Sequence, residues 1–158
     1  MADAAKANID KVDLNDMVDW LGTGRLTTNT GSGVFESAEG LRYATDIHVA
    51  EGHRIAHVLK HTSNAGGAPT LNNPFGVFDS PAETFDLIDE AWSIRVRDNL
   101  PSNPGDPVAF EIPMGRRVGT ERYLDSNGVE QTRAAEHIKV VLMNQGDTAI
   151  RTAYPVYR

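Results

Sequence analysis

The hydrophobic periodicity of this chain changes near residues 101–106, and that change limits the folds open to it. Before this point apolar residues recur at three- and four-residue steps, as in amphipathic helices, whereas after it they partly alternate, as in strands. Helical segments followed by a run of strands indicate an α+β fold rather than a doubly wound sheet. We therefore expect N-terminal helices packed on a twisted antiparallel sheet that is formed mainly by the C-terminal half.

Two helices are predicted in the middle of the chain. Residues 80–97 carry the clearer signal, because Ser80 suits the N-cap, Pro81 the first helical position and Glu83 the third, as in a capping box. The residues expected on the core face of this helix are Phe85, Ile88, Trp92 and Val96. A second helix is predicted over residues 50–61, with an apolar stripe of Ile55, Val58 and Leu59.

Strands are predicted over residues 108–113, 117–120, 137–143 and 148–156. The last two are joined by a short polar link, which is typical of an antiparallel hairpin. A further hairpin is predicted around the Asn-Gly step at residues 127–128, which is a strong signal for a tight turn.

The first forty residues differ from the rest. Residues 10–21 place apolar side chains near helical spacing, and Gly22 follows as a stop. Residues 23–37 are rich in Gly, Thr and Ser and are predicted to form a loop with a short strand around Val34 and Phe35. We therefore divide the chain into a helical lead-in or appendage, residues 1–40, and one compact domain, residues 41–158.

The composition excludes several classes of site. The 158 residues include no cysteine, which rules out disulfide scaffolds, thiolate zinc sites and thiol nucleophiles. No apolar run is long enough to span a membrane and no signal segment opens the chain, so we expect a soluble protein without a membrane segment.

The charge is unevenly distributed along the chain. Residues 1–113 carry 8 Lys and Arg against 17 Asp and Glu, a net charge of −9, and residues 114–158 carry 7 against 5, a net charge of +2. The overall charge of −7 argues against simple electrostatic binding of nucleic acid, but the basic residues gather toward the closing strand.

Three histidines, His53, His57 and His61, recur every four residues, which places them on adjoining turns of a helix. An imidazole with an ordinary pKa of about 6.5 can act as acid or base near neutrality. Metal-free cleavage of RNA needs both roles. Surface histidines on a solvated helix are the simpler alternative. Zinc binding is disfavoured because the pattern of a zinc protease, with its glutamate base, is absent.

The closing strand presents a pair of hydroxyl groups. Alternation places Ile150, Thr152 and Tyr154 on one face and Ala149, Arg151 and Ala153 on the other. A threonine hydroxyl can bind a phosphate and a tyrosine can stack on a base. The alternative is an ordinary strand, since both residues favour strands.

Cationic candidates lie on both sides of the predicted hairpin at residues 127–128. Arg116 and Arg117 stand between two glycines, and a guanidinium can stabilise the charge of a pentavalent phosphorane, although a charged turn is an equal alternative. Lys139, in the strand 137–143, is a second cation. His48 and His137 are weaker candidates and are expected at the surface.

Five segments occur in an order that resembles a known group of enzymes. They are GHRIAHVLKH (52–61), GVFD (76–79), IDEAW (88–92), MGRRVG (114–119) and TAYPV (152–156). Together they resemble the C-terminal toxin domains of bacterial polymorphic toxins. These belong to the barnase–EndoU–colicin–RelE-like ribonucleases, which include EndoU-type and RNase A-like toxins. The resemblance covers roughly residues 40–158.

The resemblance implies His57 and His61 as the catalytic histidines and Thr152 and Tyr154 as the closing hydroxyl pair. Two departures stand out. EndoU-type enzymes have a lysine in the middle of their triad, where the nearest matches here are Arg116 and Arg117, and RNase A-like toxins have an arginine shortly after the histidine, which residues 61–73 lack. The resemblance also implies a cognate immunity protein and no cofactor. It implies action in the cytoplasm, with delivery as part of a larger secreted toxin.

The expected function is that of a metal-independent endoribonuclease toxin that cleaves RNA, tRNA among the substrates, by transesterification to a 2′,3′-cyclic phosphate. His57 and His61 would serve as acid and base, Arg116 or Arg117 would stabilise the phosphorane, and Thr152 and Tyr154 would hold the phosphate or a base. His53 and Lys139 are expected to bind substrate. Two alternatives remain: a non-catalytic binding or structural module on the same scaffold, and a metal-dependent hydrolase built on the histidines.

Overall fold

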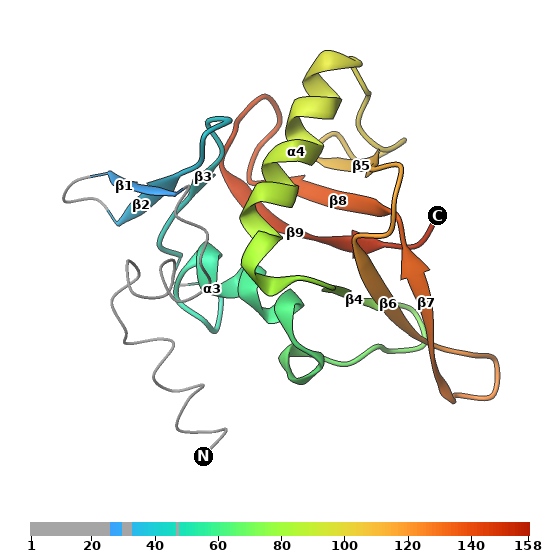
Figure 1. Ribbon diagram of the computed structural model, residues 1–158. Coiled ribbons are helices and arrows are strands. Elements are labelled where there is room, and N and C mark those ends of the chain that lie inside the picture. Colours follow the sequence, from blue (N-terminus) through green and yellow to red (C-terminus); the bar gives the residue numbers. More distant parts are fainter. Residues whose placement is uncertain (1–25, 30–32, 47) are drawn as a thin grey trace.

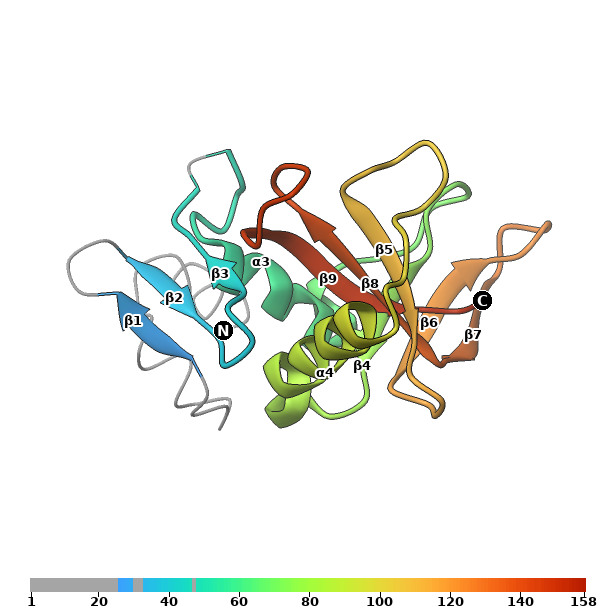
Figure 2. The same ribbon diagram turned by 90° about the horizontal axis from the view of Figure 1, so that it is seen from above.

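The structure, a computed structural model, describes residues 26–29, 33–46 and 48–158. Its strands form three antiparallel sheets, which together with two α-helices confirm the α+β class (Figure 1). Figure 2 shows two hairpins at opposite ends of the molecule: β1 (Thr27–Asn29) with β2 (Val34–Glu36), and β6 (Gly119–Leu124) with β7 (Glu130–Ala135). The helix expected over residues 10–21 lies outside the described residues. Within the described ranges, no helix is both long and apolar enough to cross a membrane.

The first sheet consists of β1 (Thr27–Asn29), β2 (Val34–Glu36) and β3 (Arg42–Tyr43). The short strand expected around Val34 and Phe35 is therefore confirmed. Phe35 pairs with Tyr43 across this sheet, and both side chains are buried in the same hydrophobic core as the helices. The sheet thus runs across residue 40, where we expected the boundary between the lead-in and the domain.

Helix α4 (Thr84–Arg97) lies across the sheet β5–β8–β9 (Figure 1). Its expected first turn is a 3-10 turn, Pro81–Glu83, in which Ser80 makes no capping hydrogen bond with its side chain. The edge-to-face contact of Trp92 with Phe110, at 5.5 Å between ring centroids, joins the helix to β5. Val96, predicted on the core face, is 58% exposed because the last turn extends beyond the packed region.

The two C-terminal sheets have the strand orders β5–β8–β9 and β4–β6–β7. Their bounds are β4 Phe75–Phe78, β5 Ala109–Pro113, β6 Gly119–Leu124, β7 Glu130–Ala135, β8 His137–Leu142 and β9 Ile150–Val156. Both predicted hairpins, β6–β7 and β8–β9, are confirmed. Strand β4 was not predicted from the sequence because all four of its residues are buried and show no alternation.

The end of β9 packs closely on the sheet β4–β6–β7. A Cβ atom on Gly76 would lie 1.9 Å from the carbonyl oxygen of Pro155, and one on Gly119 would lie 2.4 Å from the ring of Pro155. Only glycine allows this approach, since real Cβ atoms do not come so near to a backbone oxygen. The contact brings β4 beside the tyrosine that precedes Pro155.

Helix α3 (Arg54–Leu59) is shorter than the predicted 50–61 and continues as a 3-10 turn, Lys60–Thr62. It begins at residue 54 because His53 is its N-cap. Arg54 fastens it to β9 by donating from Nη1 to the carbonyl oxygen of Arg151 at 3.0 Å, and its guanidinium also pairs with Asp46. This anchoring sets α3 alongside β9.

Strand β9 contains a bulge at Arg151. Thr152 pairs with Val141 and Ile150 with Leu142, so that Arg151 has no partner in the ladder. The bulge places Ile150 on the core face with Ala153, and the predicted grouping of Ile150 with Thr152 is wrong. Thr152 and Tyr154 still share the other face.

Candidate functional site

Five of the predicted site residues lie on α3, on the 3-10 turn that follows it, and on the paired strands β8 and β9, the second of which packs against α3. Tyr154 stacks on His61 with 4.8 Å between ring centroids, Thr152 lies on the same strand face, and Lys139 pairs with Tyr154 across the ladder. His57 lies one turn before His61. We call the residues His57, His61, Lys139, Thr152 and Tyr154 the histidine site.

His61 is held as a neutral imidazole. Its ring lies between those of Phe75 and Tyr154, at 4.6 and 4.8 Å between centroids and 23° to each plane. Nδ1 lies 2.7 Å from the carbonyl oxygen of Gly76, and because a carbonyl only accepts, Nδ1 carries the proton. Burial lowers the pKa of His61 to about 4, against the smaller raising effect of that hydrogen bond. Nε2 is therefore an unprotonated acceptor at neutral pH.

His57 is oriented by a carboxylate instead. Its Nδ1 lies 3.2 Å from Oε2 of Glu51, whose Oε1 accepts from Nζ of Lys60 at 3.1 Å. The side chain of His57 is 22% exposed. Burial lowers the pKa of His57 below its ordinary value, although the hydrogen bond to Glu51 opposes this effect. Among the described residues, none forms a hydrogen bond with Nε2 of His57.

His53 uses both ring nitrogens to hold the fold. Nδ1 accepts from the backbone N–H of Ile55 at 3.0 Å, and Nε2 donates to the carbonyl oxygen of Gly33 at 2.7 Å. The side chain is buried with an edge-to-face contact to Phe35. These contacts favour a capping role over the substrate binding that we expected.

The hydroxyl of Thr152 is buried and lacks a hydrogen-bond partner within the described part of the chain. Most buried polar atoms in proteins have a partner, so this hydroxyl calls for an explanation, such as a bound water or a ligand. Thr152 lies two residues before Tyr154, about 7 Å along the strand. The two hydroxyl groups therefore lie on one face, as the alternation predicted.

Lys139 adds a cation to this face. It lies between Glu111 and Tyr154 in the row of paired residues across β5, β8 and β9. Glu111 is bound by Arg158, at 2.6 Å from each of two guanidinium nitrogens. Arg158 first, and the charge of Lys139 to a smaller extent, lower the pKa of Glu111. Within residues 26–29, 33–46 and 48–158, the ammonium of Lys139 has no ion-pair partner at 4.0 Å or less.

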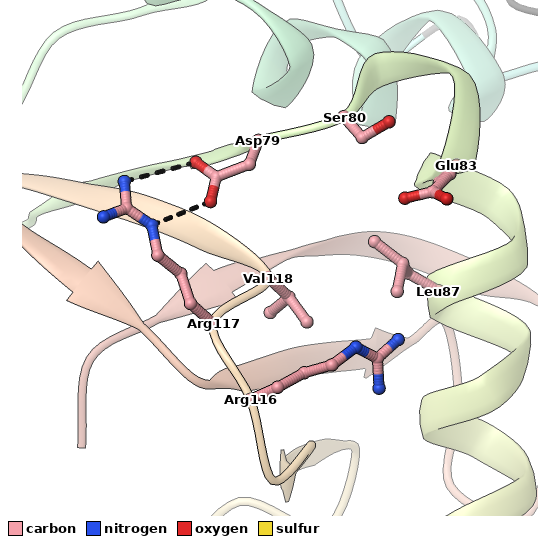
Figure 3. A pocket seen from close by; sticks show the side chains of 7 residues that line it. All are labelled: Asp79, Ser80, Glu83, Leu87, Arg116, Arg117 and Val118. Carbon is pink, nitrogen blue, oxygen red and sulfur yellow. Dashed lines mark hydrogen bonds and ion pairs between the residues drawn. The ribbon is translucent and has the colours of Figure 1, made fainter.

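Arg116 and Arg117 lie elsewhere, in the turn between β5 and β6. Arg116 binds Glu90 of α4 at 2.7 and 3.0 Å, and Nε of Arg117 binds Asp79 at 2.8 Å. Asp79, Arg116 and Arg117 line a hollow of about 70 Å³ (Figure 3). The other residues that line it are Ser80, Glu83, Leu87 and Val118. Asp79 lies three residues after Gly76, whose carbonyl oxygen binds His61. Three residues of extended strand span about 10 Å. We call the pairs Arg116–Glu90 and Arg117–Asp79 the arginine corner.

Sequence reasoning missed two groups that shape the histidine site. Glu51 lies six residues before His57, which is not a helical spacing, and only its place within the predicted helix 50–61 pointed to it. Phe75 was not assigned to any element, and its stacking on His61 depends on a strand that carried no periodic signal.

Within the described residues, no group of three or more His, Asp or Glu side chains is placed to hold a metal ion. Comparison of the chain with protein-family models, with curated proteins and with solved structures found no match in any of the three.

Proposed function

We propose that the chain is a metal-independent endoribonuclease that cleaves RNA by transesterification and leaves a 2′,3′-cyclic phosphate. The observation that carries the proposal is the placement of His57 and His61 beside the strands that carry Tyr154, Thr152 and Lys139, whose ammonium makes no ion pair with the described residues. Both imidazoles use Nδ1 within the protein and keep Nε2 for another partner. An imidazole with a free Nε2 can accept or donate the proton that such a reaction moves.

The environments of the two histidines assign their roles. His61, whose pKa is about 4, stays unprotonated and takes the proton of the 2′-hydroxyl. The 2′-oxygen then attacks phosphorus, and the bond from phosphorus to the 5′-oxygen breaks. His57, more exposed and bonded to a carboxylate, is the more easily protonated of the two and gives its Nε2 proton to the leaving 5′-oxygen. We therefore expect kcat/KM to be highest at mildly acidic pH.

The remaining groups bind the reacting phosphate. The ammonium of Lys139 stabilises the charge that builds on the phosphorane, in the role first assigned to Arg116 or Arg117. The hydroxyl of Tyr154 contacts the phosphate, and Thr152 supplies a further donor. Both arginines are already paired with carboxylates, so they are left out of this mechanism.

The test is incubation of the purified protein with a labelled RNA in the presence of EDTA. Wild type is compared with His57→Ala, Tyr154→Ala and a matched control, His48→Ala, which removes an exposed histidine outside the site. We expect a cyclic phosphate terminus from wild type and from the control, and intact RNA from the two site variants. Intact RNA with wild-type protein that is shown to be folded would reject the proposal.

The burial of His53 and His61 supports a second candidate function, a binding module without catalysis. Both rings donate to backbone carbonyls, as core histidines do. A module of this kind would bind a partner and leave RNA uncut, whereas an enzyme would turn over.

The toxin context is a further proposal, supported only by the resemblance of the five segments. Such a toxin would arrest growth when expressed alone in the cytoplasm, and an immunity protein co-expressed with it would restore growth. An acidic partner that covers Lys139 would suit that role, and tRNA is a substrate to test first.

A further inference from the structure

Glu51 is shared between two cationic partners. One carboxylate oxygen lies 3.2 Å from Nδ1 of His57, and the other lies 3.1 Å from Nζ of Lys60. The side chain of Glu51 is only 12% exposed. Although burial raises the pKa of Glu51, hydrogen bonds from its own backbone, Lys60 and His57 hold that pKa below its ordinary value. Glu51 is therefore ionised at neutral pH.

The turn before α3 brings Glu51 back to the helix. Gly52 has φ of +78°, a backbone conformation that other residues rarely adopt, and a Cβ at this position would meet no atom within 4 Å. Glycine is thus required at position 52 by its positive φ angle and not by contact with neighbouring atoms. It folds Glu51 against residues six and nine positions later in the chain.

We propose that Glu51 is the positioning residue of His57, and that Lys60 both fixes the carboxylate and weakens its hold on the imidazole. Since a carboxylate only accepts, Glu51 selects the tautomer with the proton on Nδ1 and leaves Nε2 for the substrate. A negative partner also stabilises the imidazolium that must protonate the leaving group. The inference rests on the proposed ribonuclease function.

The other groups around His57 leave Glu51 as its main electrostatic partner. Arg54 and Lys60 both act on His57 through their charge, His57 acts in turn on His61, and the strand β9 that packs against α3 carries Arg151 and Tyr154 as its titratable groups. Arg54 is paired with Asp46, which offsets its charge, and Arg151 is exposed. His61 is neutral at the relevant pH. Glu51 and Lys60 therefore act on His57 in opposite directions.

The test is imidazole NMR of the whole chain, which follows the tautomer and the pKa of His57 in four proteins. These are wild type, Glu51→Gln, Lys60→Met and the control Arg97→Gln, which removes an exposed cation of α4 outside the site. We expect Glu51→Gln to lower the pKa of His57 by about one unit and Lys60→Met to raise it by a smaller amount. The control should leave this pKa unchanged. In a plot of kcat/KM against pH, the alkaline limb reports the deprotonation of His57. The two substitutions should therefore move this limb in the same directions as the pKa.

If Glu51 had only a structural role, Glu51→Gln would change the stability of the protein but would leave the pKa of His57 where it is. Equal pKa values in wild type and Glu51→Gln would therefore overturn the inference. The NMR measurement needs no RNA. If wild-type protein leaves RNA uncut, the ribonuclease proposal fails, but the pKa of His57 in the variants still decides whether Glu51 positions His57.

Discussion

The histidine site and the arginine corner carry similar numbers of polar side chains but use them differently. In the arginine corner each guanidinium is bound by a carboxylate, and all four side chains are at least 40% exposed. In the histidine site Lys139 lacks an ion pair within the described residues, and the hydroxyl of Thr152 is buried without a partner. The two regions thus differ in whether their polar groups are already paired with other described residues.

The largest difference between the two regions should follow from His57→Ala. General acid–base catalysis typically contributes about 10²–10⁴-fold, so we expect kcat/KM on RNA to fall by about that factor. The measurement is initial cleavage rate at subsaturating substrate. A loss of less than fivefold in a folded variant would show that the catalytic imidazole lies elsewhere.

Acidification should destabilise the protein through His61. Its pKa is 6.5 in the unfolded chain and about 4 when folded, so the unfolded state binds more protons between these values. The stability contributed by neutral His61 is complete above pH 6.5 and is lost as pH falls to 4, in total about 3 kcal/mol. Denaturant titrations of wild type and His61→Phe across this range should diverge by that amount, and parallel curves would contradict it.

Removal of the unpaired cation should affect catalysis more than binding. Loss of one group that stabilises transition-state charge costs about 10²-fold in kcat, so Lys139→Met should approach that value with a smaller change in KM. Arg97→Gln, which removes an exposed cation paired with Asp98, is the matched control. A change confined to KM would assign Lys139 to ground-state binding only.

The smallest effect is expected in the arginine corner. Arg116→Gln and Arg117→Gln break exposed ion pairs, which contribute little to stability. We expect kcat/KM within about twofold of wild type, as surface ion pairs outside a site rarely matter, and an unchanged midpoint of urea unfolding. A large loss of activity in either variant would transfer the phosphate-binding role back to this corner.

The sequence was sufficient to predict elements whose signal is local. Helix α4 and the hairpin β8–β9 follow from periodicity, and the pairing of Thr152 with Tyr154 on one face follows from alternation. The bulge at Arg151 does not, because it depends on the ladder with β8 and on the contact of Arg54 with this residue.

The site shows the same division between local and tertiary signals. The spacing of His57 and His61 is a local property, whereas their separate pKa values depend on burial and on Glu51. The carboxylates that neutralise Arg116 and Arg117 are 26 and 38 residues away in sequence. No pattern within the MGRRVG segment could have indicated them.

Strand β9 lies at the edge of its sheet, and its features close that edge to another strand. Pro155 has no N–H to offer, the carbonyl of Arg151 already accepts from Arg54, and Ala149 is bridged to Arg42. Unprotected edges invite self-association and recognition by strand addition. Addition of a further strand along β9 is therefore disfavoured.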